Sequence, residues 1–137
     1  MSDKIFLGVD PGRSKTGLAL VDERGDIIEL YIAKTAILRV ELETFLKKRR
    51  IAAVIIGDGT NSEFVSEQIK RVLPWVRQFV VDEAYSTEEA RQLYWEINPP
   101  KGWRRFLPLS MQVPPEPLDA YAAVIQVHRH FEEQVEK

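Results

Sequence analysis

Residues 8–17 read GVDPGRSKTG. An apolar run ends there at Asp10, a Pro-Gly pair turns the chain, and a second apolar run starts at Thr16. A carboxylate at the end of a buried strand is unfavourable unless positive charge meets it. The turn itself carries two cations, Arg13 and Lys15, which suit phosphate groups. This stretch therefore predicts a strand, a tight turn and a second strand, with a site for metal and phosphate between them.

The composition predicts a single globular domain over residues 1–137. A chain of this length buries roughly 70% of its unfolded surface. The absence of cysteine excludes disulfides and thiolate zinc sites. A net charge of -2 gives no overall basic field, so any nucleic acid must bind locally. The short, charged N-terminal segment predicts neither a signal peptide nor a membrane span, and we expect a cytoplasmic protein with no membrane partner.

Hydrophobic periodicity predicts alternating strands and helices. Three strands joined by tight turns come first, at residues 4–10, 16–22 and 26–33. Two later apolar runs predict strands buried on both faces, at 51–56 and 79–81. Helices are predicted at 36–50, 61–73, 87–97 and 118–134. Thr60 with Glu63, and Ser86 with Glu89, are spaced as capping boxes for the second and third of these helices.

This order of elements predicts the topology of the sheet. Right-handed crossovers place the fourth strand beside the first, and the fifth beside the fourth. The result is an α/β fold with a five-stranded mixed sheet of order 3-2-1-4-5 and helices on both faces, which resembles the ribonuclease H-like fold. Asp10 would then lie in the middle of the sheet at the carboxyl end of its strand, where open α/β sheets bind ligands.

Other acids are expected near Asp10. Asp119 lies in the first turn of the last predicted helix, where the helix dipole favours a carboxylate. Asp58 directly follows the neighbouring strand, about 4.8 Å away at the usual strand spacing. Asp82 and Glu83 end the strand beyond, although the longer Glu83 side chain can reach back. Strand spacing favours Asp58 as the third acid, and all of these acids also suit ordinary turn or helix-start positions.

Basic residues form two clusters. Lys47–Arg50 close a predicted helix, where cations complement the helix dipole. Trp75, next to a helix end, is expected to cover the core.

The second basic cluster lies between Pro99 and Pro115, a stretch without acids. It contains Lys101, Arg104, Arg105 and, between them, Trp103. An exposed aromatic ring among cations can stack on a base while the cations hold phosphates. The alternative is that this tryptophan caps the core.

Three motifs carry a resemblance to a known family. GVDPGRSKTG resembles the first-strand signature of the YqgF/RuvX group of RuvC-like nucleases. VDEAYSTEEAR, residues 81–91, and LDAYAAVI, residues 118–125, are similar to later motifs of that group and follow in the same order. Two positions depart from the pattern: Ala84 stands where an arginine usually follows Asp-Glu, and the last helix offers one acid, Asp119, where RuvC has two.

The resemblance implies a divalent-metal endonuclease that acts on structured nucleic acid, either ribosomal-RNA precursor or branched DNA. Phosphodiester hydrolysis needs charge neutralisation, which carboxylate-bound Mg²⁺ or Mn²⁺ supplies. The resemblance favours Glu83 as the third acid. The expected catalytic residues are Asp10, Glu83 and Asp119, and the expected metal ligands are Asp10, Asp58, Glu83 and Asp119. The expected nucleic-acid contacts are Arg13, Lys15, Lys101, Trp103, Arg104 and Arg105. Both a monomer and a homodimer are compatible with the sequence.

Two other functions fit these residues. One is a ribonuclease H-like domain that binds nucleic acid or protein without cutting, which retained binding without cleavage would reveal. The other is an ATP-binding fragment, because the DPG turn with Thr16 and Gly17 also resembles the first phosphate loop of actin-like kinases. Those enzymes close a nucleotide between two such domains, whereas 137 residues supply one. ATP binding would identify this alternative.

Overall fold

The computed structural model describes residues 4–84, 86–108 and 117–136. Its strands are β1 (Ile5–Asp10), β2 (Lys15–Asp22), β3 (Ile27–Lys34), β4 (Ala53–Gly57) and β5 (Gln78–Val81). Its helices are α1 (Leu38–Leu46), α2 (Ser62–Val72), α3 (Ser86–Ile97) and α4 (Asp119–Glu136). Two short 3-10 turns, η1 (Thr35–Ile37) and η2 (Gly102–Phe106), complete the described elements.

The strands form one sheet of order β3-β2-β1-β4-β5, which confirms the predicted order. The central strand β1 is antiparallel to β2 and parallel to β4, and β4 is parallel to β5. The carboxyl ends of β1, β4 and β5 therefore meet at one edge of the sheet. Asp10 ends β1 at this edge and faces Gly17 of β2 across the ladder.

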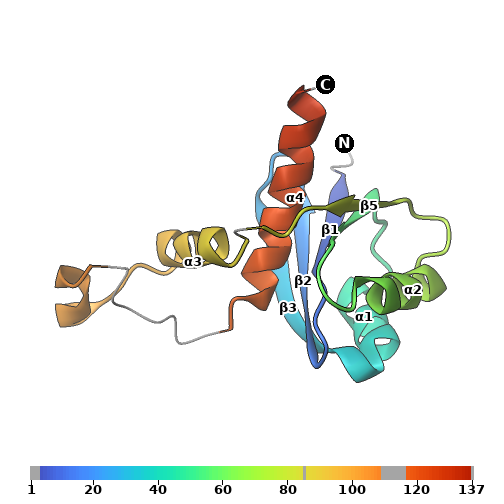
Figure 1. Cartoon of the computed structure of the whole chain (residues 1–137), viewed down its shortest axis with the longest axis horizontal. Coiled ribbons are helices and arrows are strands. Elements are labelled where there is room, and N and C mark those ends of the chain that lie inside the picture. The colour runs from blue at the N-terminus through green and yellow to red at the C-terminus, as the bar shows by residue number, and fades with distance from the viewer. Residues whose placement is uncertain (1–3, 85, 109–116, 137) are drawn as a thin grey trace.

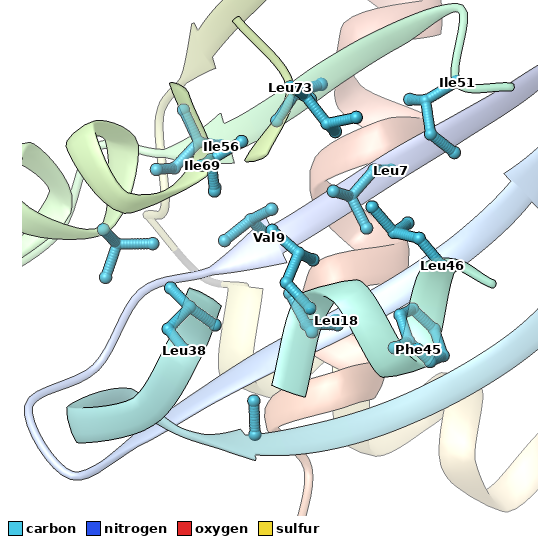
Figure 2. Close-up of a cluster of buried hydrophobic side chains, with 14 of the residues drawn as sticks. Leu7, Val9, Leu18, Leu38, Phe45, Leu46, Ile51, Ile56, Ile69 and Leu73 are labelled. Carbon is cyan, nitrogen blue, oxygen red and sulfur yellow. The ribbon is translucent and has the colours of Figure 1, made fainter. Parts of the chain in front are cut away.

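Helices lie on both faces of the sheet (Figure 1). Side chains that alternate along β1 therefore face two helical layers. Leu7 and Val9 pack with α1 and α2 in the core cluster that Figure 2 shows. Gly8 and Asp10 lie at the alternate positions, which face the opposite side of the sheet, where α4 packs. Helix α3 packs mainly on α4, and together with η2 it extends away from the body of the molecule (Figure 1). No helix within the described ranges has the length and apolar character needed to cross a bilayer.

Helix α1 is shorter than predicted. Its four predicted core residues, Leu38, Leu42, Phe45 and Leu46, are buried. It ends at Leu46, because the next two lysines have left-handed backbone with φ of 50° and 62°. The basic segment 47–50 therefore follows the helix, and the prediction that it closes the last turn was wrong.

Helix α2 lacks the predicted capping box. Asn61, not Thr60, takes the N-cap position, with φ of 73° and no side-chain capping bond. Its amide Nδ2 instead donates a hydrogen bond of 3.0 Å to the carbonyl of Gly12. The residue thus links the start of α2 to the turn after β1, which local capping rules do not predict.

Glycines let α4 lie directly on the sheet. A Cβ on Gly17 would come within 1.9 Å of the Asp119 carbonyl oxygen, and one on Gly8 within 2.2 Å of the Ala123 carbonyl oxygen. Both obstacles are backbone atoms of the helix, so neither can swing aside. The missing side chains therefore set the distance between α4 and the sheet, and with it the position of Asp119.

We expect Gly17→Ala to lower the free energy of unfolding by about 2–3 kcal/mol, because overpacking against backbone forces the helix outward. Gly57→Ala is the matched control on the same face of the sheet, since its Cβ would meet only the movable Glu83 side chain. Urea unfolding of both variants in chelator measures the difference. Equal losses for the two would show that α4 is not held at this distance by Gly17.

Candidate active site

The turn after β1 is held by a network that spans three parts of the chain. The Gly12 carbonyl accepts hydrogen bonds from Thr35 Oγ1 and Asn61 Nδ2, both at 3.0 Å. Thr35 Oγ1 also lies 2.8 Å from the buried Thr16 Oγ1. These bonds tie the turn to the end of β3 and to the β4–α2 loop, so the backbone beside Asp10 is fixed. No local sequence signal marks Thr35 and Asn61, because they lie 23 and 49 residues from Gly12.

Asp10 is half-buried at the centre of the carboxyl edge of the sheet. The two cations of the following turn, Arg13 and Lys15, are exposed. Within the described residues neither forms an ion pair with Asp10, so the carboxylate is not neutralised by its own turn. Both cations stay available to an outside anion.

Glu83 reaches across β4 toward Asp10. A Cβ on Gly57 would lie 2.2 Å from Glu83 Oε1, and a Cβ on Gly59 would lie 1.9 Å from Oε2. The β1–β4 register, which pairs Val9 with Ile56, makes Gly57 the neighbour of Asp10. The carboxylate therefore crosses the strand over two glycines, and its approach to Asp10 depends on their missing side chains.

Asp58 and Asp82 take different positions from Glu83. Asp58 is exposed, and its Oδ1 accepts the backbone N–H of Glu83 at 3.1 Å. Asp82 is also exposed, and its Oδ1 accepts the N–H of Ala84 at 2.8 Å. Asp58 is thus joined to the backbone of Glu83, and Asp82 to its own loop.

Asp119 begins α4, as predicted, and is half-buried. Its main chain rests on Gly17, which pairs with Asp10 in the ladder. The charge of Asp119 is close enough to raise the pKa of Asp10. The structure therefore places acids from three separate elements at one edge of the sheet.

This crowding perturbs both inner carboxyls. Burial, then the charge and hydrogen bonding of Glu83, and last the charge of Asp119 raise the pKa of Asp10 to about 8. Burial is also the main cause that raises the pKa of Glu83, opposed by hydrogen bonds from Asp10 and the Gly59 backbone. Two adjacent carboxyls with raised pKa values share a site that favours positive charge.

Arg129 of α4 supports the segment that carries Glu83. Its guanidinium donates to the Asp82 carbonyl and lies 3.1 Å from Glu89 Oε1. Its charge also opposes the rise in the pKa of Glu83. This role of Arg129 could not be predicted, because no local pattern joins it to a segment more than forty residues earlier.

Asp10 and Glu83 offer the oxygen donors that a divalent cation prefers. Glu83 Oε1 is buried and has no hydrogen-bond partner among the described residues. A buried carboxylate oxygen left in this way is costly unless a cation or donor meets it. Hard cations prefer carboxylate oxygens and retain waters, so they can complete their shell with few protein ligands. The described ranges hold no group of three or more acidic or histidine side chains gathered closely enough to enclose a metal ion. The close pair is Asp10 and Glu83, with Asp119 beside it.

The raised pKa values predict a pH dependence of stability without metal. Asp10 has a pKa of 3.8 as a free side chain and about 8 in the fold. The folded state therefore binds the proton more tightly, and stability falls as pH rises from about 4 to about 8. We expect Asp10→Asn to remove most of this slope and to raise stability at pH 7 in chelator. Urea unfolding across this range checks it; equal slopes for both proteins would contradict the shift.

The predicted substrate loop lies apart from the acids. Figure 1 shows η2 beyond α3, well away from the end of β1. Lys101 and Arg105 are exposed, and the Arg105 guanidinium lies 5.0 Å from the centroid of the Phe106 ring, which is 77% exposed. The side chains of Trp103 and Arg104 lie outside the described part of the structure.

Comparison with known proteins reveals similarity at the level of structure. No protein-family model matches the sequence, and no curated protein matches it. Among solved structures, Thermus thermophilus RuvC is similar with a TM-score of 0.60 and 16% identity, over 96% of each chain. T. thermophilus RuvC in complex with a Holliday junction substrate is similar with a TM-score of 0.61 and 15% identity, over 98% of this chain and 97% of that one. This chain therefore has the ribonuclease H-like fold that RuvC has, as predicted.

Proposed function

We propose that the chain is a divalent-metal nuclease that hydrolyses phosphodiester bonds in structured nucleic acid, as a member of the YqgF/RuvX group. The observation that carries the proposal is the passage of Glu83 over Gly57 and Gly59 to Asp10, at the edge where Asp119 begins α4. Three acids from distant parts of the chain approach one another although their mutual repulsion is unfavourable. A bound cation removes that cost.

Asp10, Glu83 and Asp119 would hold Mg²⁺ or Mn²⁺. Such a cation would neutralise charge on the phosphate and activate a water for attack. Asp58 accepts the backbone N–H of Glu83 and is exposed to solvent. We therefore assign it a weaker contribution to metal affinity. Arg13 and Lys15 are exposed on the turn that follows Asp10, where they can bind the phosphates on either side of the cleaved bond.

Two substrates follow from the proposal. One of the similar RuvC structures is in complex with a Holliday junction, and the sequence motifs resemble those of the YqgF/RuvX group. We therefore propose either branched DNA or ribosomal-RNA precursor as the substrate.

Incubation of each with the protein, in Mn²⁺ and in chelator, tests the proposal. Metal-dependent cleavage of at least one is expected. Binding of either substrate without cleavage under any condition would instead favour the non-catalytic alternative. That alternative is the second candidate, because the described residues contain no closed group of three metal ligands.

The loop of residues 101–105 is proposed as a substrate contact. Lys101, Arg104 and Arg105 have no acid near them in sequence, whereas the whole chain is slightly acidic. Replacing all three with alanine should weaken nucleic-acid binding. The slope of log affinity against log salt concentration should become shallower by about 0.9 per lost phosphate contact on duplex DNA. Metal affinity should not change. Trp103→Ala should weaken binding with little change in that slope, since stacking releases no counterions. An unchanged slope for the triple variant, measured by anisotropy, would contradict this role.

A further inference from the structure

A cationic cavity lies at the end of the sheet opposite to the acids. The segments that enter β4 and β5 form it, whereas Asp10 is the last residue of β1 and Glu83 follows the end of β5. Its volume is about 680 Å³. A five-residue strand such as β4 is about 16 Å long at 3.3 Å per residue, so this cavity is separate from the acidic site.

The walls of this cavity carry one sign of charge. Its lining includes Lys48, Arg49, Arg50 and Arg77 and no acidic residue. Nη2 of Arg49 forms an ion pair with Glu29 Oε1 at 3.2 Å. Nη1 of the same guanidinium is buried without a hydrogen-bond partner among the described residues. A buried guanidinium nitrogen without an acceptor is unfavourable. The cavity therefore suits an anion.

Trp75 adds a flat aromatic surface to the cationic walls. Its side chain is 83% exposed, so the expectation that it covers the core was wrong. Ile51 and Leu73, which Figure 2 shows in the core cluster, already close that end of the interior and are 6% and 9% exposed. Trp75 also lines a second hollow of about 520 Å³, which shares Lys48, Arg49 and Leu73 with the first. The indole therefore stands free at the boundary of two hollows.

The backbone that carries the cations adopts an unfavourable conformation. Lys47 and Lys48 both have positive φ, a conformation that is unfavourable for residues other than glycine. Glycine is the usual residue there. This turn directs the chain from the end of α1 into the cavity wall at Lys48. Strained backbone of this kind is concentrated at ligand sites.

We propose that this cavity binds single-stranded nucleic acid, with a base stacked on Trp75 and the neighbouring phosphates on Lys48, Arg50 and Arg77. The proposed nuclease function motivates only the choice of ligand class. An exposed indole beside cations matches a base next to its phosphates, and a base must leave a duplex before it can stack. An acidic peptide would use the cations and leave the indole without a partner. A substrate with a single-stranded arm would thereby contact the protein at both ends of the sheet.

Fluorescence anisotropy with a labelled six-nucleotide strand in chelator tests the stacking. Trp75→Ala should weaken binding by roughly 5-fold or more, the effect of one stacked base. The same substitution should have little effect on a strand of equal length whose nucleotides are abasic. Because Trp75 is exposed, the variant should keep the melting temperature of the parent.

Two adjacent lysines supply the matched control for the charges. Lys47→Gly and Lys48→Gly each remove one cation and one positive-φ side chain, but only Lys48 lines the cavity. Both variants should melt at a higher temperature than the parent. Only Lys48→Gly should weaken binding, with the logarithmic salt slope reduced by about 0.7 on a single strand.

Two results would overturn the proposal. One is a Trp75→Ala variant that binds like the parent, or that loses equal affinity for normal and abasic strands. The other is an equal effect of Lys47→Gly and Lys48→Gly on the salt slope. Because binding is measured without metal or cleavage, failure here would leave the proposed nuclease untouched, and an inactive nuclease would leave this binding untouched.

Discussion

Asp10→Asn should abolish metal-dependent cleavage while the protein stays folded. Asparagine keeps the shape of the side chain and removes the charge that a hard cation needs. A bound metal contributes several kcal/mol of charge stabilisation, so we expect a rate at least about 1,000-fold lower. Single-turnover cleavage in Mn²⁺ measures the effect.

The control for Asp10→Asn is Asp82→Asn, which changes an exposed acid beside Glu83 that faces its own loop. That variant should retain most of the activity. Parent-like cleavage by Asp10→Asn would remove the metal site from this edge of the sheet.

Glu83→Gln should lower metal affinity far more than Asp58→Asn. Glu83 carries a buried, unpartnered oxygen beside Asp10, whereas Asp58 holds the N–H of Glu83 from an exposed position. Asparagine at position 58 keeps an oxygen that can accept the Glu83 N–H, and even full loss of an orienting partner typically costs 10- to 100-fold in affinity. We therefore expect at most about 10-fold for Asp58→Asn and more than about 100-fold for Glu83→Gln. Calorimetric titration with Mn²⁺ measures both.

Gly57→Ala separates the position of Glu83 from its chemistry. The added Cβ would collide with the Glu83 carboxylate and displace it without touching any charge. Gly57→Ala should lower the metal affinity when it is introduced into the parent. In a Glu83→Gln background it should cause no further loss, because the two substitutions act on the same contact. Additive losses in this cycle, or a larger loss for Asp58→Asn than for Glu83→Gln, would make Asp58 the third ligand.

The sheet could be predicted from sequence, because each strand is marked by an apolar run and each connection by its length. The five-strand order follows from the tight turns between the first three strands and from right-handed crossovers to the last two. The end of α1 could not be predicted, since the left-handed conformations of Lys47 and Lys48 oppose the preference of lysine for helix. The exposure of Trp75 was missed for a related reason: whether a large apolar side chain covers the core depends on what Ile51 and Leu73 already fill.

The sequence named Asp10, Glu83 and Asp119 as candidates and showed that Glu83 is long enough to reach back, but it did not predict the path of that side chain. Strand spacing pointed to Asp58, one strand from Asp10. The structure instead brings Glu83 to Asp10 from two strands away, because Gly57 and Gly59 leave β4 bare beneath its side chain. Spacing rules count strands and do not include the length of a side chain or the absence of one below it. The hydrogen bonds of Asn61 and Arg129 depend on tertiary contacts of the same kind.

Asp10, Glu83 and Asp119 are proposed to hold a divalent cation. The most direct measurement is an anomalous difference map from crystals of the protein grown with Mn²⁺. We predict a peak at the carboxyl edge of the sheet, within bonding distance of the carboxylates of Asp10 and Glu83, with Asp119 completing the set directly or through a water. A peak bound by Asp58 and not by Glu83, or no peak at this edge in crystals that bind Mn²⁺ elsewhere, would contradict the claim.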